Sequence, residues 1–119
     1  MRELTSHKVN GLNESIYIEV LDAPGAGGAC HQYRMTCGNP AFVTDIAFQN
    51  GPIAEAGVNG ISQEALLAIV EDRLLCFQAG PYACRENAIA LTKIQEAMMW
   101  LQKRTRDRMA RGVEGTSKV

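Results

Sequence analysis

The first half of the chain alternates between apolar and polar side chains in three short runs. In the first run, Ile16, Ile18 and Val20 occupy every second position. Turn-forming segments such as Gly38-Asn39-Pro40 separate the runs, and a period of two between such turns is typical of β-strands. The pattern predicts a small antiparallel β-meander with strands over residues 15–21, 31–37 and 42–48.

Beyond residue 60 the apolar period lengthens to that of an α-helix. Ser62 suits the position that caps a helix N-terminus, and Glu64 in the first turn complements the helix dipole. The run Ala79-Gly80-Pro81 ends this helix. A second helical pattern covers residues 86–111, so the two patterns predict an antiparallel helical hairpin.

These patterns predict an α+β fold in a single domain over residues 1–119. A β-strand region over residues 1–60 precedes the helical hairpin of residues 61–111, which contains a long C-terminal helix. The glycine-rich residues 112–119 predict a tail or cap. A chain of 119 residues suits one compact domain, although it is small for a core that stands alone.

The length of the second helix bears on assembly. A helix over residues 86–111 extends about 40 Å at about 1.5 Å per residue. A domain of this size has a radius of gyration of only about 13 Å. The apolar stripe that contains Met98, Met99 and Trp100 is then partly uncovered in a monomer, unless the strands fold over the hairpin. We expect other copies of the chain to cover it in a homo-oligomer.

Charge is balanced overall but uneven along the chain. The formal net charge is -1, yet residues 103–119 hold six of the twelve Lys and Arg residues. This bias favours an anionic partner. No apolar run approaches the roughly 18 residues of a membrane span, and the N-terminus lacks the pattern of a signal peptide. We therefore expect a cytoplasmic protein without a membrane partner.

The cysteines do not indicate a metal site. Cys30, Cys37, Cys76 and Cys84 lack the close paired spacing of structural zinc sites, and Cys30-His31 is the one Cys/His neighbour pair. Without a secretory signal, we expect the four to be free thiols. The sequence predicts neither a metal nor another cofactor.

The candidate binding residues begin with two arginines near the end of the second helix. Continuing the helical spacing from Leu101 places Arg104 and then Arg108 on the side of the apolar stripe. A charge on a buried stripe is costly unless an anion meets it, and arginine binds phosphate through two parallel hydrogen bonds. The alternative is a solvated basic helix end, which the helix dipole favours anyway.

Two residues at the other end of the hairpin are further candidates. Phe77, near the end of the first helix, is either part of the hairpin core or a platform that stacks on a purine. Asn87, at the start of the second helix, is either a first-turn polar residue or an amide that reads a base or ribose edge. The residues alone indicate an oligomeric α+β protein with an anion-binding helix.

Several sequence motifs, taken in order, carry a resemblance to a known family. They are residues 48–60 (FQNGPIAEAGVNG), 84–87 (CREN), 90–93 (ALTK), 99–101 (MWL), 103–108 (KRTRDR) and 111–116 (RGVEGT). Together they resemble the first-described family of phage Thoeris anti-defence proteins over roughly residues 42–117. The helical hairpin is also similar to that of the second anti-CBASS protein family, which sequesters cyclic oligonucleotides.

The resemblance implies sequestration without catalysis. Members of the family bind the cyclic ADP-ribose isomers made by bacterial TIR-domain enzymes in the host cell, and do not cleave them. The family's ligand-binding phenylalanine, asparagine and two arginines fall on Phe77, Asn87, Arg104 and Arg108. Members assemble as hexamers, and some bind cyclic trinucleotides at separate pockets on a threefold axis. For such a second pocket, Arg85 is the candidate.

The spacing of these residues bears on how one pocket is formed. The arginines and the Phe77/Asn87 pair lie at opposite ends of the long helix, some 25 Å apart at the helical rise. One chain does not easily bring both ends to one small molecule, whereas two antiparallel copies do. We therefore hypothesise that each pocket lies between protomers.

Two other functions compete with a nucleotide sponge. A phosphodiesterase that degrades the same nucleotide lacks support, because the sequence has no paired-histidine motif, metal constellation or Ser/His/Asp arrangement. A nucleic-acid-binding protein would use the basic helix end. The balanced charge and an aromatic content of 6% disfavour it.

Overall fold

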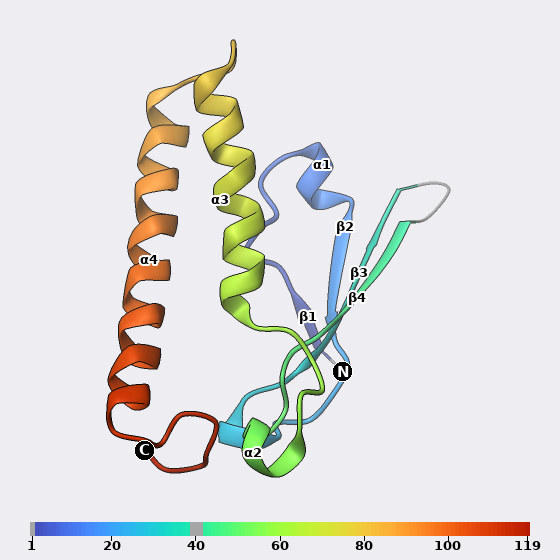
Figure 1. Ribbon diagram of the computed structural model, residues 1–119. Helices are drawn as coiled ribbons and strands as arrows, with labels where there is room; N and C mark the ends of the chain where they lie inside the picture. Colours follow the sequence, from blue (N-terminus) through green and yellow to red (C-terminus); the bar gives the residue numbers. More distant parts are fainter. Residues whose placement is uncertain (1, 39–41) are drawn as a thin grey trace. The chain divides into compact units, whose positions relative to one another are not determined.

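The computed structural model describes residues 2–38 and 42–119 (Figure 1). It divides into two compact units, residues 1–61 and 62–119. The boundary falls where the apolar pattern changes from a period of two to a helical period. The single domain over residues 1–119 stays a prediction, and each unit is described here by itself. The predicted turn at Gly38-Asn39-Pro40 lies partly outside the described residues.

The first unit is built on an antiparallel four-stranded sheet with the strand order β1-β2-β3-β4. The strands are β1 (Arg2–Leu4), β2 (Ile16–Val20), β3 (Gln32–Cys37) and β4 (Phe42–Ala47). Neighbours in sequence are neighbours in the sheet, so the predicted meander is confirmed. It contains one strand more than predicted, because β1 has only three residues and shows no alternation. A short helix, α1 (Gly11–Glu14), was also missed.

The two faces of the sheet differ in chemistry. Val20 is 1% exposed and lies opposite Tyr33, whose ring meets that of Phe48 edge-on at a centroid distance of 5.7 Å. The neighbouring cross-strand pair is polar: the Arg34 Nε lies 2.7 Å from a carboxylate oxygen of Asp45. This alternation is the signal that made the strands predictable.

Side-chain amides close the segment that follows β4. Gln49 donates to the carbonyls of Gly51 and Gly57 and accepts from the backbone N–H of Asn59. Phe48 and Ile61 form a parallel bridge, and α2 (Ile53–Ala56) lies between them in sequence. These hydrogen bonds explain the glutamine and asparagines of the motif over residues 48–60.

The second unit is an antiparallel hairpin of α3 (Gln63–Ala79) and α4 (Arg85–Ala110), as predicted (Figure 1). The Ser62 hydroxyl accepts from the Ala65 N–H at 3.1 Å, which confirms the predicted N-cap. The predicted α+β fold is thereby confirmed. None of the helices formed by residues 2–38 and 42–119 combines the length and the hydrophobicity that a membrane-spanning segment needs.

Half-buried positions of α4 recur at intervals of three and four residues. These positions, here called the α4 seam, are Asn87, Leu91, Ile94, Met98, Leu101 and Thr105, with the half-buried Ala97 beside Met98, and they are followed by the buried Arg108. Such spacing keeps one stripe of a helix against its neighbour. The seam ends at Arg108, where the candidate site begins.

Candidate functional site

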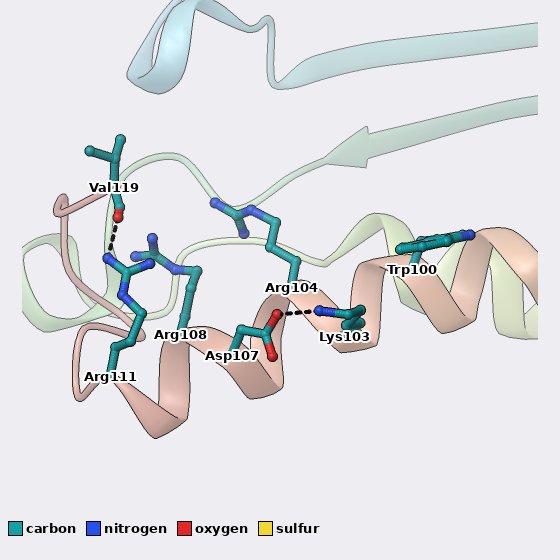
Figure 2. Close-up of a pocket in the computed structure, with 7 residues that line it drawn as sticks. All are labelled: Trp100, Lys103, Arg104, Asp107, Arg108, Arg111 and Val119. Atoms are coloured by element: carbon teal, nitrogen blue, oxygen red, sulfur yellow. Dashed lines mark hydrogen bonds and ion pairs between the residues drawn. The ribbon is translucent and has the colours of Figure 1, made fainter.

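A cavity of about 440 Å³ lies at the C-terminal end of α4, within the second unit (Figure 2). Its lining is an aromatic ring, four cations, one carboxylate and the last residue of the chain: Trp100, Lys103, Arg104, Asp107, Arg108, Arg111 and Val119. Trp100, Arg104 and Arg108 are spaced by four residues, so they follow one side of the helix. The cavity lies at the basic helix end that the sequence indicated.

Arg104 contributes an unpaired guanidinium to the lining of this cavity. It is exposed, and within the described parts of the chain its guanidinium has neither a hydrogen-bond acceptor nor an ion-pair partner. Lys103 differs, because its ammonium lies 2.7 Å from the Asp107 carboxylate. A solvated guanidinium at a cavity wall is available to bind an anionic ligand.

The expectation that Arg104 continues the apolar stripe was wrong. Thr105 occupies that position of the α4 seam, half-buried, and its hydroxyl donates to the Leu101 carbonyl at 3.2 Å. Spacings of three and four residues from Leu101 lead to adjacent positions, so periodicity alone did not choose between them. Threonine satisfies its one hydroxyl on the helix backbone, which leaves the arginine outside.

Arg108 does lie on the seam, as the spacing predicted. The residue is 8% exposed, and its Nε donates to a Glu114 carboxylate oxygen at 3.2 Å. Its terminal nitrogens donate to the carbonyls of Val113, Thr116 and Lys118 at 3.0, 3.1 and 2.6 Å. A buried guanidinium is tolerated because it is paired and hydrogen-bonded. In this chain the partners come from the residues that follow α4.

The C-terminal segment 112–119 is folded back on the end of α4. Gly112 and Gly115 adopt φ angles of 71° and 79°, a region that glycine enters without strain. Val113 is 9% exposed, and Arg111 donates to the Val119 carbonyl (Figure 2). The glycines therefore mark turns of an ordered cap. Glu114 is the residue of this cap that sequence reasoning did not single out.

Phe77, Asn87 and Arg85 lie at the opposite end of the hairpin. The half-buried Phe77 ring has the Arg73 guanidinium carbon 5.0 Å from its centroid and meets Tyr82 edge-on at 6.4 Å. Asn87 is half-buried, and Arg85 is exposed. From Asn87 to Arg104 the helix rises about 25 Å. One chain thus brings the two arginines together and keeps them apart from Phe77 and Asn87.

Comparison with known proteins decides the family. The family model described as "Acb2/Tad1, hairpin domain" matches residues 43–106, more than half of the chain. The chain belongs to this family. The prediction of family membership, which rested on sequence motifs, is confirmed.

A curated relative of this Acb2/Tad1 hairpin protein is "Thoeris anti-defense 1" of Bacillus phage SBSphiJ7. The two sequences are 55% identical over 71 residues, which is 60% of the chain and 50% of the relative. The chain spans half the length of this relative. All of the candidate residues except Arg108 fall within the matched hairpin domain, and Arg108 follows its end by two positions.

Trp100 is a residue of this cavity to which the sequence gave a different role. Its side chain is 65% exposed, and it lines both the arginine cavity and a neighbouring one of about 300 Å³ with Met99 and Arg106. Sequence reasoning assigned Trp100 to assembly alone. Its spacing of four residues before Arg104 is the signal that could have placed it beside the two arginines of the cavity.

Titratable groups give no sign of a metal centre in the described ranges. Over residues 2–38 and 42–119, no three His, Cys, Asp or Glu side chains are grouped to hold a metal. The four cysteines are free. Hydrogen bonds from the backbone N–H groups of His31 and Gln32 lower the pKa of Asp22. This shift lies in the sheet unit and not at the arginine cavity.

Proposed function

We propose that this protein binds and sequesters cyclic ADP-ribose-type nucleotides in the cytoplasm of an infected bacterium, and so counteracts Thoeris defence without cleaving the signal. The observation that carries the proposal is the exposed Arg104 guanidinium, which lines a cavity beside Trp100 and Arg108. The relative from Bacillus phage SBSphiJ7, "Thoeris anti-defense 1", supports the biological setting by its name.

The chemistry of the ligand fits the side chains. A cyclic ADP-ribose isomer has a pyrophosphate, a purine and two riboses. Arg104 and Arg108 supply positive charge for the pyrophosphate. Phe77 stacks on the purine, and the Asn87 amide fixes its orientation.

The ligand site lies between two protomers in this proposal. The arginines and the Phe77/Asn87 pair are separated by about 25 Å of helix, which exceeds the reach of one small nucleotide. Two antiparallel copies bring opposite helix ends together. The exposed side chains of Met99 and Trp100, 55% and 65% accessible in the single chain, support an interface along α4. We propose a homo-oligomer, a hexamer by family resemblance.

A sponge must hold its ligand at low abundance. Nanomolar affinity corresponds to about -12 kcal/mol, and association itself costs several kcal/mol in lost freedom. A cavity on one helix end leaves most of a nucleotide in water, which is a further reason to place the pocket between subunits.

The test is a capture-and-release experiment. Purified protein is mixed with a slight deficit of a cyclic ADP-ribose isomer and filtered, and the retained fraction is denatured. Chromatography of the released material then reports the state of the nucleotide. Intact nucleotide in the retained fraction supports sequestration. Cleaved nucleotide would show a phosphodiesterase, and nucleotide in the filtrate would show that this ligand is not bound.

A second pocket for cyclic trinucleotides is a separate part of the proposal. Arg85 is exposed and has no hydrogen-bond or ion-pair partner in the described part of the chain. The same filtration with a cyclic trinucleotide tests it, and Arg85→Ala should abolish trinucleotide retention alone. Loss of both ligands in Arg85→Ala would contradict separate pockets.

A further inference from the structure

Arg108 is held by the segment that follows its own helix. Guanidinium has five N–H donors, and four of them are directed at oxygens of Val113, Glu114, Thr116 and Lys118. These acceptors all lie within ten residues of Arg108 in sequence. One donor on a terminal nitrogen remains, and the side chain still lines the cavity.

Glu114 differs from the other acceptors because it carries charge. Its carboxylate oxygen lies 3.2 Å from the Arg108 Nε, and the arginine side chain is 10% exposed. Among the described residues it is the carboxylate that pairs with Arg108. All four hydrogen bonds are charge-assisted because the guanidinium is ionised, and Glu114 adds the attraction of an opposite charge. Removal of Glu114 therefore changes both the hydrogen bonding of the Nε edge and the charge beside this guanidinium.

We propose that Glu114 is a positioning residue of the nucleotide pocket. It holds the Nε edge of Arg108 against the C-terminal segment, so that the remaining donor and the positive charge stay directed at the cavity. The inference rests on the proposed function and adds a residue to it. Without Glu114, the terminal nitrogens keep their carbonyl acceptors, but the Nε edge loses its partner and the guanidinium is held less firmly in the orientation in which it borders the cavity.

Removal of the Glu114 carboxylate should weaken nucleotide binding if Glu114 positions Arg108, whereas electrostatics alone predicts tighter binding. Removing a carboxylate from the edge of an anion site makes the local field more positive, which by itself tightens the binding of a pyrophosphate. Loss of a positioning contact weakens the binding instead, because the guanidinium must then be ordered when the ligand arrives. The two explanations predict opposite changes in affinity for one substitution.

The experiment is isothermal titration of the full chain with a cyclic ADP-ribose isomer. The wild-type protein is compared with Glu114→Ala, Glu114→Gln and Glu96→Ala. Glutamine keeps an oxygen that accepts from Nε and loses the charge. Glu96 is an exposed residue of α4 that pairs with Lys93 at 3.7 Å, so Glu96→Ala controls for losing one surface carboxylate.

The expected result is weakening by about tenfold in Glu114→Ala, less in Glu114→Gln, and no more than about twofold in Glu96→Ala. The Arg108 Nε–H signal in NMR spectra should be protected from solvent exchange in the wild type and in Glu114→Gln. In Glu114→Ala it should exchange rapidly while the melting temperature and the signals of α3 stay unchanged. A general structural role would not move that signal alone.

Tighter or unchanged binding in Glu114→Ala would overturn the proposal, as would a protected Nε–H signal in that variant. A melting temperature lowered in proportion to the loss of affinity would also overturn it, because Glu114 would then be a stability residue. Wild-type protein that captures no nucleotide would contradict the proposed function instead. Failure of the two proposals is therefore distinguishable.

Discussion

The ammonium of Lys103 lies 2.7 Å from the Asp107 carboxylate, one turn further along α4. This pair occupies one side of the cavity lining and compensates one of its positive charges (Figure 2). Arg104, the next residue, has no such partner in the described part of the chain. Of these two adjacent cations, Arg104 is therefore more available to bind an anionic ligand than Lys103. Substitution of each residue tests this difference.

Arg104→Gln should abolish most nucleotide capture, because none of the donors of this guanidinium is paired within the described part of the chain. Loss of a charge-assisted contact to a desolvated phosphate costs about 2–5 kcal/mol. Isothermal titration with a cyclic ADP-ribose isomer measures the loss. Light scattering should show an unchanged mass, because a change from arginine to glutamine removes the charge and leaves the apolar side chains of Met99 and Trp100 in place; a lower mass would assign Arg104 to assembly instead.

Lys103→Gln is the matched control for Arg104. It removes one positive charge from the same cavity, but from a cation already paired with Asp107. Its effect on capture should be severalfold smaller than that of Arg104→Gln. Equal effects in the two variants would mean that the cavity attracts the ligand by net charge alone and that Arg104 has no specific contact.

Trp100→Ala should lower the mass of the assembly in solution. The indole is 65% exposed in the single chain and adjoins Met99, which is 55% exposed, and such neighbouring apolar side chains mark interfaces. Size-exclusion chromatography with light scattering measures the mass. Val9→Ala is the control, because Val9 is 87% exposed in the sheet unit and its loss should leave the mass unchanged. A Trp100→Ala protein of wild-type mass would refute the assignment to assembly.

The strands and helices were predictable because local chemistry and burial agree in them. Ser62 caps α3, and Ala79 is its last residue, directly before Gly80-Pro81. Ile16, Ile18 and Val20 alternate with more polar neighbours in β2. Segments with weak local signals were missed, such as β1, which has three residues and exists through its pairing with β2.

The site was only partly predictable, because its details depend on contacts that a helical period does not encode. The sequence placed Arg104 on the stripe, but Thr105 takes that position and leaves the arginine exposed. The sequence also placed Arg108 opposite an anion. It did not show that the Glu114 carboxylate supplies a negative charge to Arg108, because this contact requires the turns at Gly112 and Gly115.

Phe77→Leu should weaken nucleotide capture while preserving the hairpin. Leucine retains apolar volume at this half-buried position but removes the π-face that we propose stacks on a purine, and such stacking is worth about 1–3 kcal/mol per base. Titration measures the affinity, and circular dichroism measures the helix content. Tyr82→Leu removes the neighbouring ring, 73% exposed, and should have a smaller effect. If Tyr82→Leu weakens capture more, then Tyr82 is the stacking residue.

The stabilising contribution of the Asp22 carboxylate to the sheet unit should be lost in acid. Its carboxylate accepts from the backbone N–H groups of His31 and Gln32, which lowers its pKa in the folded state. A lowered folded pKa stabilises the protein above the pKa of the unfolded chain, and this contribution is lost as the pH falls through the folded value. The melting temperature of the wild type should exceed that of Asp22→Asn at pH 7. The difference should shrink below about pH 4, and a difference independent of pH would exclude the carboxylate as its cause.

Gly60→Ala should destabilise the sheet unit, because the new methyl has no space. A Cβ at Gly60 would lie 2.5 Å from the carbonyl carbon of Phe48 and 2.7 Å from the carbonyl oxygen of Ala47. Both are backbone atoms, held where Ile61 donates to Ala47 and pairs with Phe48. Overpacking of this kind costs about 1–3 kcal/mol, or a fall of several degrees in melting temperature for a small domain.

Gly11→Ala, at the start of α1 with no atom within 4 Å of its Cβ, should be neutral or slightly stabilising. Equal melting temperatures for the two variants would show that the segment after β4 yields easily to the added methyl.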